Sequence, residues 1–224
     1  DFCLSRGLGD VYKRQALQNA DCIFCPETRT IRGQIFSRAA GILHALDIPD
    51  TTLSRFALPM SKNREQAFAA YDKVYSEASL LHKENKKVCI VAEGDAGFYS
   101  SIHYIFEKLQ ADNIPVQHIA GIPAFIAAGA CAGLHIASQE ERLTVIPGII
   151  TAEEIEKYME EKTTIVIMKL SQCIEEVHRC IHLHPEYNYH YFENIGMEKE
   201  KYLHDTELLS LIHISEPTRQ AEIS

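Results

Sequence analysis

Hydrophobic positions along the chain follow two alternating patterns. Short apolar runs, such as VCIVAEG at 88–94, are typical of strands buried on both faces of a sheet. Other stretches keep apolar residues on one helical face, as around 102–109, where they fall at i, i+3, i+4 and i+7. The predicted strands or extended segments are 22–26, 53–59, 88–94, 116–121, 142–148, 163–169 and 188–196. The predicted helices are 34–46, 62–84, 123–134, 151–161 and 172–183. A further helix is predicted to begin after 100–101, where Ser100 or Ser101 can cap it.

Repeated β–α units of this kind predict an α/β fold built on a largely parallel sheet. Long helices precede Gly121 and shorter units follow it, which favours a boundary at that point. The expected organisation is therefore an N-terminal α/β subdomain over 16–120 and a C-terminal α/β subdomain over 121–208.

The two ends of the chain are related through DNA rather than through protein structure. A back-translation of DFCLSRGLGDVYKRQ (1–15), read as its reverse complement, gives LSLIHISEPTRQAEI (209–223) at every position. We therefore expect 1–15 and 209–224 to be translated adapter sequence. The natural segment is then about Ala16 to Leu208, and we expect both natural termini to be missing.

Composition excludes some functions. The chain has 22 Lys and Arg against 31 Asp and Glu, a formal net charge of -9. An acidic chain is a poor match for nucleic-acid binding, which depends on neutralising phosphates. No uninterrupted apolar run reaches the ~18 residues that suggest a membrane span, so no membrane association is predicted.

The cysteines and histidines indicate core positions rather than a metal site. Six cysteines lie within 16–208 without the dense spacing of a disulfide scaffold, so we expect free thiols in a reducing cytoplasm. Cys22 and Cys25 could be half of a redox or zinc site, but residues three apart on a strand face opposite sides, which favours core packing. His178, His182 and His184 could form a metal patch, although an exposed helix end is favoured and no metal is predicted.

Three predicted strand ends are candidates for ligand binding, because open parallel sheets bind ligands at the carboxyl ends of their strands. They are 93–97 (EGDAG), 121–124 (GIPA) and 168–169 (MK). The first combines two glycines, a carboxylate and a helix start, and lacks both common phosphate-binding glycine motifs. It suits a neutral or zwitterionic ligand carrying a ribose or an amino group. The alternative is a tight turn capped by Asp95.

The same residues resemble a known family. VAEGDAGFYSS followed by HIAGIPAF resembles the paired loops of the tetrapyrrole methylases, the class III S-adenosylmethionine-dependent methyltransferases. ALQNADCIFCP resembles the first conserved segment of that family. LPMSKNREQAFAAYDKV, GLHIASQEERLTVIPG, TIVIMKL and YFENIGMEKEK resemble the branch that methylates C20 of precorrin-2 or cobalt-factor II. The resemblance covers essentially all of 16–208.

The resemblance implies a fold, a reaction and a cofactor. The implied fold has two α/β subdomains with the cofactor cleft between them. The implied reaction is methyl transfer from S-adenosylmethionine to C20 of precorrin-2 or cobalt-factor II, in a cytoplasmic homodimer. Two departures matter. Ala96 stands where the family has proline, so the turn is expected to be looser. The family's first strand and last strands would fall outside 16–208, so we expect this chain to lack them and to be unstable or inactive.

Site residues follow from the resemblance by position. Asp95 is the candidate for a catalytic side chain, and a turn-capping role is its alternative. Met168 could neighbour the adenine or pack in the core, and Tyr99 and Tyr104 could line the macrocycle or pack in the core. The implied cofactor contacts are Gly94, Asp95, Phe98, Ser100, Ser101, Pro123, Ala124, Met168 and Gly196. The candidate substrate-binding cations are Arg29, Arg32, Arg55, Lys62 and Arg64, with solvated surface charge as the alternative for each.

Three other functions stay open at this point. One is a methylase of the same family that acts at another ring position. The second is a nucleotide-binding module without catalysis, and the third is a nicotinamide oxidoreductase with a doubly wound sheet. The missing G-x-G-x-x-G motif counts against the last of these.

Overall fold

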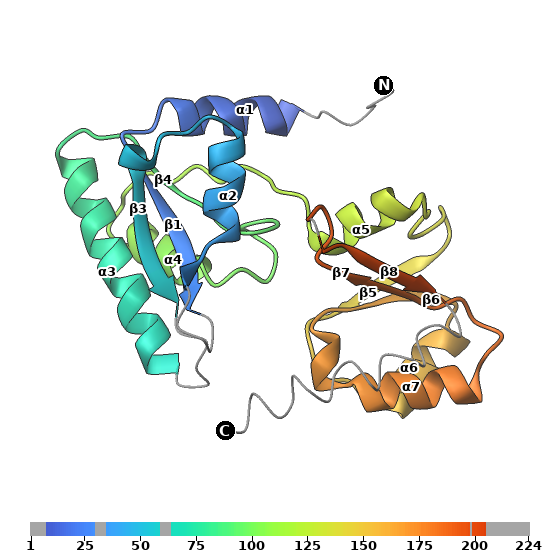
Figure 1. Ribbon diagram of the computed structural model, residues 1–224. Helices are drawn as coiled ribbons and strands as arrows, with labels where there is room; N and C mark the ends of the chain where they lie inside the picture. The colour runs from blue at the N-terminus through green and yellow to red at the C-terminus, as the bar shows by residue number, and fades with distance from the viewer. Residues whose placement is uncertain (1–7, 30–34, 59–63, 198, 205–224) are drawn as a thin grey trace. The chain divides into compact units, whose positions relative to one another are not determined.

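The computed structural model describes residues 8–29, 35–58, 64–197 and 199–204. The chain forms two compact units, Asp1–Ile122 and Pro123–Ser224, and each is described by itself. The mixed α/β architecture predicted from the sequence is confirmed (Figure 1). The subdomain bounds and the adapter origin of the two ends stay predictions; helix α1 (Leu8–Gln18) spans the expected junction at Gln15 and Ala16.

The first unit is built on β1 (Cys22–Arg29), which is the central strand of its sheet. It pairs in parallel with β3 (Leu53–Leu58) along one side and with β4 (Val88–Ile90) along the other. Near its carboxyl end it pairs antiparallel with the short β2 (Ile35–Phe36). The three strands therefore point toward the same edge of the sheet, and Figure 1 shows this direction for β1 and β3.

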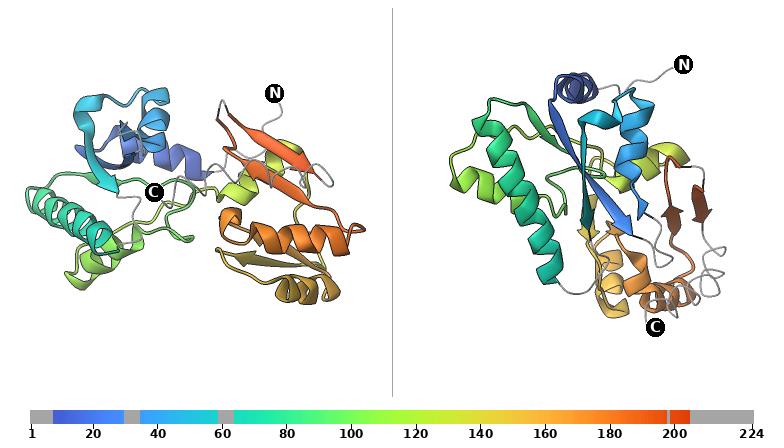
Figure 2. Two further views of the ribbon diagram at one scale, coloured as in Figure 1. Left: turned by 60° about the horizontal axis from the view of Figure 1, so that its bottom comes forward. Right: turned by 60° about the vertical axis from the view of Figure 1, so that its left-hand side comes forward.

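Helices cover both faces of this sheet. Phe24 of β1 packs with α3 (Arg64–Lys83) and α4 (His103–Ala111), whereas Ile23 and Cys25 pack with α2 (Arg38–Ala45). The two views of Figure 2 show this sandwich of helix, sheet and helix. Cys22 packs on the Phe24 side and Cys25 on the Ile23 side, which confirms that the two thiols face opposite sides.

The second unit contains a parallel pair of strands and an antiparallel hairpin. Strands β5 (Arg142–Ile146) and β6 (Thr163–Ile167) are parallel, and β7 (His190–Glu193) pairs antiparallel with β8 (Lys201–His204). Helices α6 (Ala152–Glu160) and α7 (Ile174–Leu183) share a core with β5 and β6. This unit also contains α5 (Ala124–Ala132) and the 3₁₀ turn η2 (Leu170–Gln172), whereas the 3₁₀ turn η1 (Asp50–Thr52) belongs to the first unit. Within the described part of the chain, no helix is both long and apolar enough to cross a bilayer.

The structure corrects several predicted elements. The segment 116–121 is not a strand, because its end lies against the 94–97 turn instead of joining the sheet. Strand β4 stops at Ile90, four residues early, because the chain turns at Gly94. The helix predicted from 34 begins at Arg38, because 35–36 pair with β1 and Ser37 caps the helix through its bond to Ala40 N (3.1 Å). His178, expected on an exposed helix end, is buried and only 6% exposed.

Candidate functional site

A pocket of about 240 Å³ opens at the carboxyl edge of the sheet in the first unit. Strands β1 and β3 line it with Pro26, Thr28, Phe56 and Leu58, and the chain beyond β4 lines it with Ala92 and Glu93. The helical side contributes Ser37 and Arg38 of α2, Tyr71 of α3, and the segment 99–102 before α4. This is the position at which open parallel sheets bind ligands.

The loop beside the pocket is shaped by close backbone approach. Gly94 has φ +76°, which L-residues rarely adopt, and Tyr99 has φ +50°. A Cβ on Gly121 would lie 2.6 Å from Asp95 Cα, so the 116–121 segment can approach the loop only because residue 121 is glycine. Non-glycine residues with positive φ often lie at functional sites, and Tyr99 lines the pocket.

The carboxylate of Asp95 connects the 94–97 turn to the 116–121 segment. This carboxylate accepts a hydrogen bond from Gly97 N at 2.8 Å and another from Gly121 N. His118 Nε2 lies 3.8 Å from the same carboxylate, whose side chain is 15% exposed. The Gly121 N–H, and then the Gly97 N–H and the charge of His118, hold the pKa of Asp95 below its usual range. Asp95 is not among the pocket-lining residues, so this geometry favours the turn-capping alternative.

We predict that Asp95→Asn lowers the free energy of unfolding at neutral pH by about 1–3 kcal/mol, because a charged acceptor of two backbone donors is lost. Because the folded-state pKa of Asp95 is depressed, its contribution is complete above the unfolded carboxyl pKa of ~3.9. It is lost as the pH falls through the lower folded-state pKa. The measurement is urea unfolding of both proteins from pH 7 downward. The difference between them should shrink below about pH 4, and a pH-independent difference would contradict this role.

The pocket holds one pair of opposite charges and one buried hydroxyl contact. Arg38 Nη1 lies 3.9 Å from Glu93 Oε2, and the two side chains are 43% and 54% exposed. Among the lining residues that the structure describes, these are the one cation and the one carboxylate. Tyr71, which is 6% exposed, donates a hydrogen bond from its hydroxyl to Ser101 Oγ at 2.6 Å. The hydroxyl of Ser101 is thereby oriented at the pocket wall.

The predicted site residues do not all line the same pocket. Ser100, Ser101 and Tyr99 line the pocket, whereas Gly94, Asp95 and Phe98 form the loop beside it and are not lining residues. Tyr104 packs on Tyr71 and Phe68 in the core. The other four predicted cofactor contacts belong to the second unit. Pro123 and Ala124 lie at the start of α5, and Met168 follows β6. Gly196 lies in the turn between β7 and β8 and has φ +77°. Their cofactor roles stay predictions.

Of the five predicted substrate-binding cations, only Arg55 has a described side chain. Arg55 pairs with Asp50 at 2.7 Å and is not a lining residue. Arg29 ends β1 and Arg64 begins α3, and only their backbone is described. Arg32 and Lys62 lie outside the described residues. Arg38 and Tyr71 were missed as site residues, and no local signal pointed to either of them. Glu93 lies in the strand end 93–97 that was predicted as a ligand-binding candidate, but it was given no role of its own there.

Neighbouring histidines do not assemble a metal site in the described ranges, where no group of three or more potential ligands could hold an ion. His184 Nε2 contacts Glu156 Oε1 at 3.3 Å, while His178 is buried in α7. The described site is therefore one of hydroxyls, a single ion pair and aromatic walls.

The chain is an α/β protein with a pocket at the carboxyl ends of its parallel strands, which is where open α/β sheets bind their ligands. Its family is more specific: the chain belongs to the Tetrapyrrole (Corrin/Porphyrin) Methylases, whose family model matches residues 12–208.

Two curated relatives match over shorter regions. One is a "Probable cobalt-precorrin-2 C(20)-methyltransferase" of Methanocaldococcus jannaschii, 27% identical over 165 residues, which are 73% of this chain and 66% of that protein. The other is a "Precorrin-2 C(20)-methyltransferase" of a Sinorhizobium species, 29% identical over 107 residues, or 47% of this chain and 43% of the relative. The match thus spans less than two thirds of the length of each relative.

Solved structures share the fold. A cobalt precorrin-4 methyltransferase superposes with a TM-score of 0.64 at 17% identity, covering 93% of this chain and 83% of its own. A uroporphyrin-III C-methyltransferase of Thermus thermophilus, solved in complex with S-adenosyl homocysteine, superposes with a TM-score of 0.54 at 11% identity, covering 92% and 84%. Both are tetrapyrrole methylases, which agrees with the predicted fold class.

Proposed function

We propose that this protein is an S-adenosylmethionine-dependent methyltransferase that methylates C20 of precorrin-2 or of its cobalt-bearing counterpart, cobalt-factor II. The observation that carries the proposal is that both curated relatives have names that specify position C20 of a precorrin-2 substrate. Membership of the tetrapyrrole methylase family supports the reaction class.

Within the first unit, the proposed cofactor contacts lie on the loop from Gly94 to Ser101. For Pro123, Ala124, Met168 and Gly196 of the second unit, a cofactor role stays a prediction from the family resemblance. The residues present suit S-adenosylmethionine, which carries a ribose and a zwitterionic amino acid and no phosphate. Ser100 and Ser101 offer hydroxyls to the pocket, and the backbone turns at Gly94, which is exposed. Among the lining residues that the structure describes, Arg38 is the one cation. The related enzyme of Thermus thermophilus was solved with the demethylated product of this cofactor.

The size of the pocket limits what it can hold. Its volume of about 240 Å³ lies below the ~300–1,000 Å³ of typical ligand sites. It would therefore accept only part of a large ligand, such as one edge of a tetrapyrrole. We propose that Phe56, Leu58 and Phe36 form its apolar wall against the macrocycle, and that Arg38 meets a substrate carboxylate.

The chemistry needs little from the protein besides placement. The cofactor supplies a methyl group already activated by its positive sulfur. The chain's own groups need to hold the macrocycle carbon in line with that methyl group and exclude water. Alignment of two reactants can contribute roughly 7–11 kcal/mol to lowering a barrier. Tyr71 contributes by fixing the hydroxyl of Ser101, because that hydrogen bond is largely buried.

The test is transfer of an isotopically labelled methyl group. Because natural segments are expected beyond 16–208, the protein extended by them is incubated with labelled S-adenosylmethionine and either precorrin-2 or cobalt-factor II. Mass spectrometry follows the label. One added methyl group at C20 is the expected result. The substrate that is methylated faster shows whether the enzyme prefers the cobalt-bearing or the metal-free tetrapyrrole. Methylation at another ring position would replace C20 specificity with that position. Cofactor binding with no transfer to either tetrapyrrole would favour a binding module.

A further inference from the structure

A methine carbon that gains a methyl group must lose its hydrogen if the macrocycle is to keep its conjugation. A reaction at C20 therefore needs a proton acceptor as well as a methyl donor. We propose that Glu93 is this acceptor. The inference rests on the proposed function and deepens it, because it assigns the second half of the same reaction to a residue of this chain.

Glu93 is the acidic residue in the described part of the pocket lining. It lies directly after Ala92, beyond the end of β4, and precedes the Gly94 turn. Its side chain is 54% exposed, and the guanidinium of Arg38, from the first residue of α2, lies 3.9 Å away on the same pocket wall. This contact leaves most of the carboxylate accessible to a ligand in the pocket.

The other candidate acceptors are less suitable. Asp95 uses its carboxylate for the N–H groups of Gly97 and Gly121 and does not line the pocket. Tyr71 donates its hydroxyl proton to Ser101. A positioned carboxylate is a common general base, and Glu93 is the carboxylate among the described lining residues.

Each bond that breaks in the proposed step is matched by one that forms. The methine carbon forms a bond to the methyl carbon, and the bond from that carbon to sulfur breaks, leaving its electron pair on sulfur. The methine carbon now carries both hydrogen and methyl next to a cationic π-system, so its C–H bond is acidic. That bond breaks, its electron pair restores the conjugation, and Glu93 takes the proton. No oxidant or reductant is required.

We predict that Glu93→Gln slows methylation by about 10²-fold or more, the usual scale for loss of a positioned acid or base. The affinity for S-adenosylmethionine, measured by calorimetry, should stay unchanged. Substrate carrying deuterium at C20 should distinguish proton removal from other roles. Proton removal becomes slower in the variant, so the ratio of rates for light and deuterated substrate should rise above its wild-type value. Glu93→Asp, which keeps a carboxylate, should recover part of the rate.

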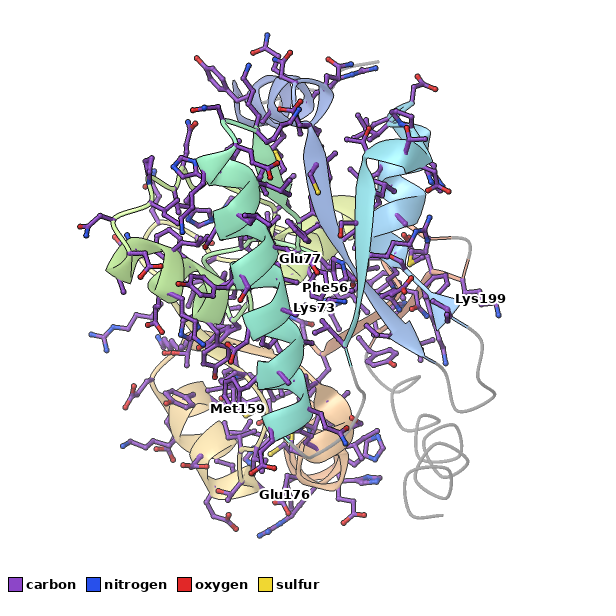
Figure 3. The ribbon with its side chains drawn as sticks, turned by 90° about the vertical axis from the view of Figure 1, so that its left-hand side faces the viewer. Phe56, Lys73, Glu77, Met159, Glu176 and Lys199 are labelled. Carbon is purple, nitrogen blue, oxygen red and sulfur yellow. The ribbon has the colours of Figure 1, made fainter. Side chains whose placement is uncertain are left out.

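The matched control is Glu77→Gln. Glu77 is also an exposed, ion-paired glutamate: its side chain is 44% exposed and lies 3.8 Å from Lys73, with both residues on α3 (Figure 3). It is not a pocket-lining residue, so methylation and the isotope effect should not change. Exposed ion pairs contribute only ~0–1 kcal/mol, so neither variant should unfold.

Three results would overturn the assignment of Glu93. They are a wild-type rate in Glu93→Gln, a rate loss without a larger isotope effect, and a rate loss explained by weaker cofactor binding. A wild-type protein that methylates no tetrapyrrole would instead overturn the proposed function itself. The wild-type reaction therefore separates failure of the inference from failure of the function on which it rests.

Discussion

Gly121→Ala should lower the free energy of unfolding of the first unit by about 2–4 kcal/mol, as expected when a new methyl group meets backbone and hydrogen bonds are lost with it. The added Cβ would lie 2.6 Å from Asp95 Cα and 2.8 Å from the carbonyl carbon of Gly94. These are backbone atoms, which cannot rotate away as a flexible side chain can. The 116–121 segment would have to move, and the Gly121 N–H would leave the Asp95 carboxylate.

Gly41→Ala is the matched control for this prediction. Gly41 lies within α2, and a Cβ there would meet nothing within 4 Å. Alanine is favoured over glycine inside a helix by roughly 0.5–1 kcal/mol, so this variant should be slightly more stable than the wild type. Urea unfolding measures both variants. Equal stability of Gly121→Ala and wild type would show that the two segments do not approach as described.

Phe24→Ala should lower the free energy of unfolding by about 3–5 kcal/mol, the usual cost of removing a buried aromatic side chain. Phe24 lies on the central strand β1 and is 1% exposed. It packs with Phe56, Ile105 and other residues of the cluster under α3 and α4. Truncation would leave a cavity between the sheet and both helices, directly behind the strand ends that line the pocket.

Phe68→Ala provides the comparison. Phe68 is on α3 but 38% exposed, and its main aromatic contact is an edge-on one with Tyr104 at 4.9 Å between ring centroids. A pair of that kind contributes about 0.5–1.5 kcal/mol beyond burial, so the loss should be clearly smaller than for Phe24. Chemical denaturation of the two variants decides between them. Equal losses would contradict a core centred on Phe24.

The function of Asp95 shows how one residue type can support two interpretations. A carboxylate beside two glycines at a strand end is compatible both with ligand binding and with turn capping. The structure adds Gly121, which is 26 residues away in sequence and donates to the same carboxylate. Asp95 thereby connects the two loops that resemble paired loops of the methylase family. Substitution of Asp95 is expected to disturb the site through loop position.

Much of the first unit could be predicted from the sequence, because its signals are local. Apolar runs identified the segments of β1, β3 and β4, and a strand's period of two placed Cys22 and Cys25 on opposite faces of β1. The 3.6-residue period identified α3 to within two residues at its start. The paired loop motifs identified the family, which the match over 12–208 confirms.

Only the tertiary structure decided which groups share the pocket. Arg38, Tyr71 and Glu93 come from three separate elements and meet because the sheet brings the carboxyl ends of β1, β3 and β4 to one edge. The sequence pattern predicted a strand at 116–121 and selected Arg55 as a substrate contact. In the structure that segment lies against a turn, and Arg55 pairs with Asp50. The period of the apolar residues predicts which positions face the core. It does not identify the residue, distant in sequence, that pairs with a given charged group or accepts a hydrogen bond from a given N–H group.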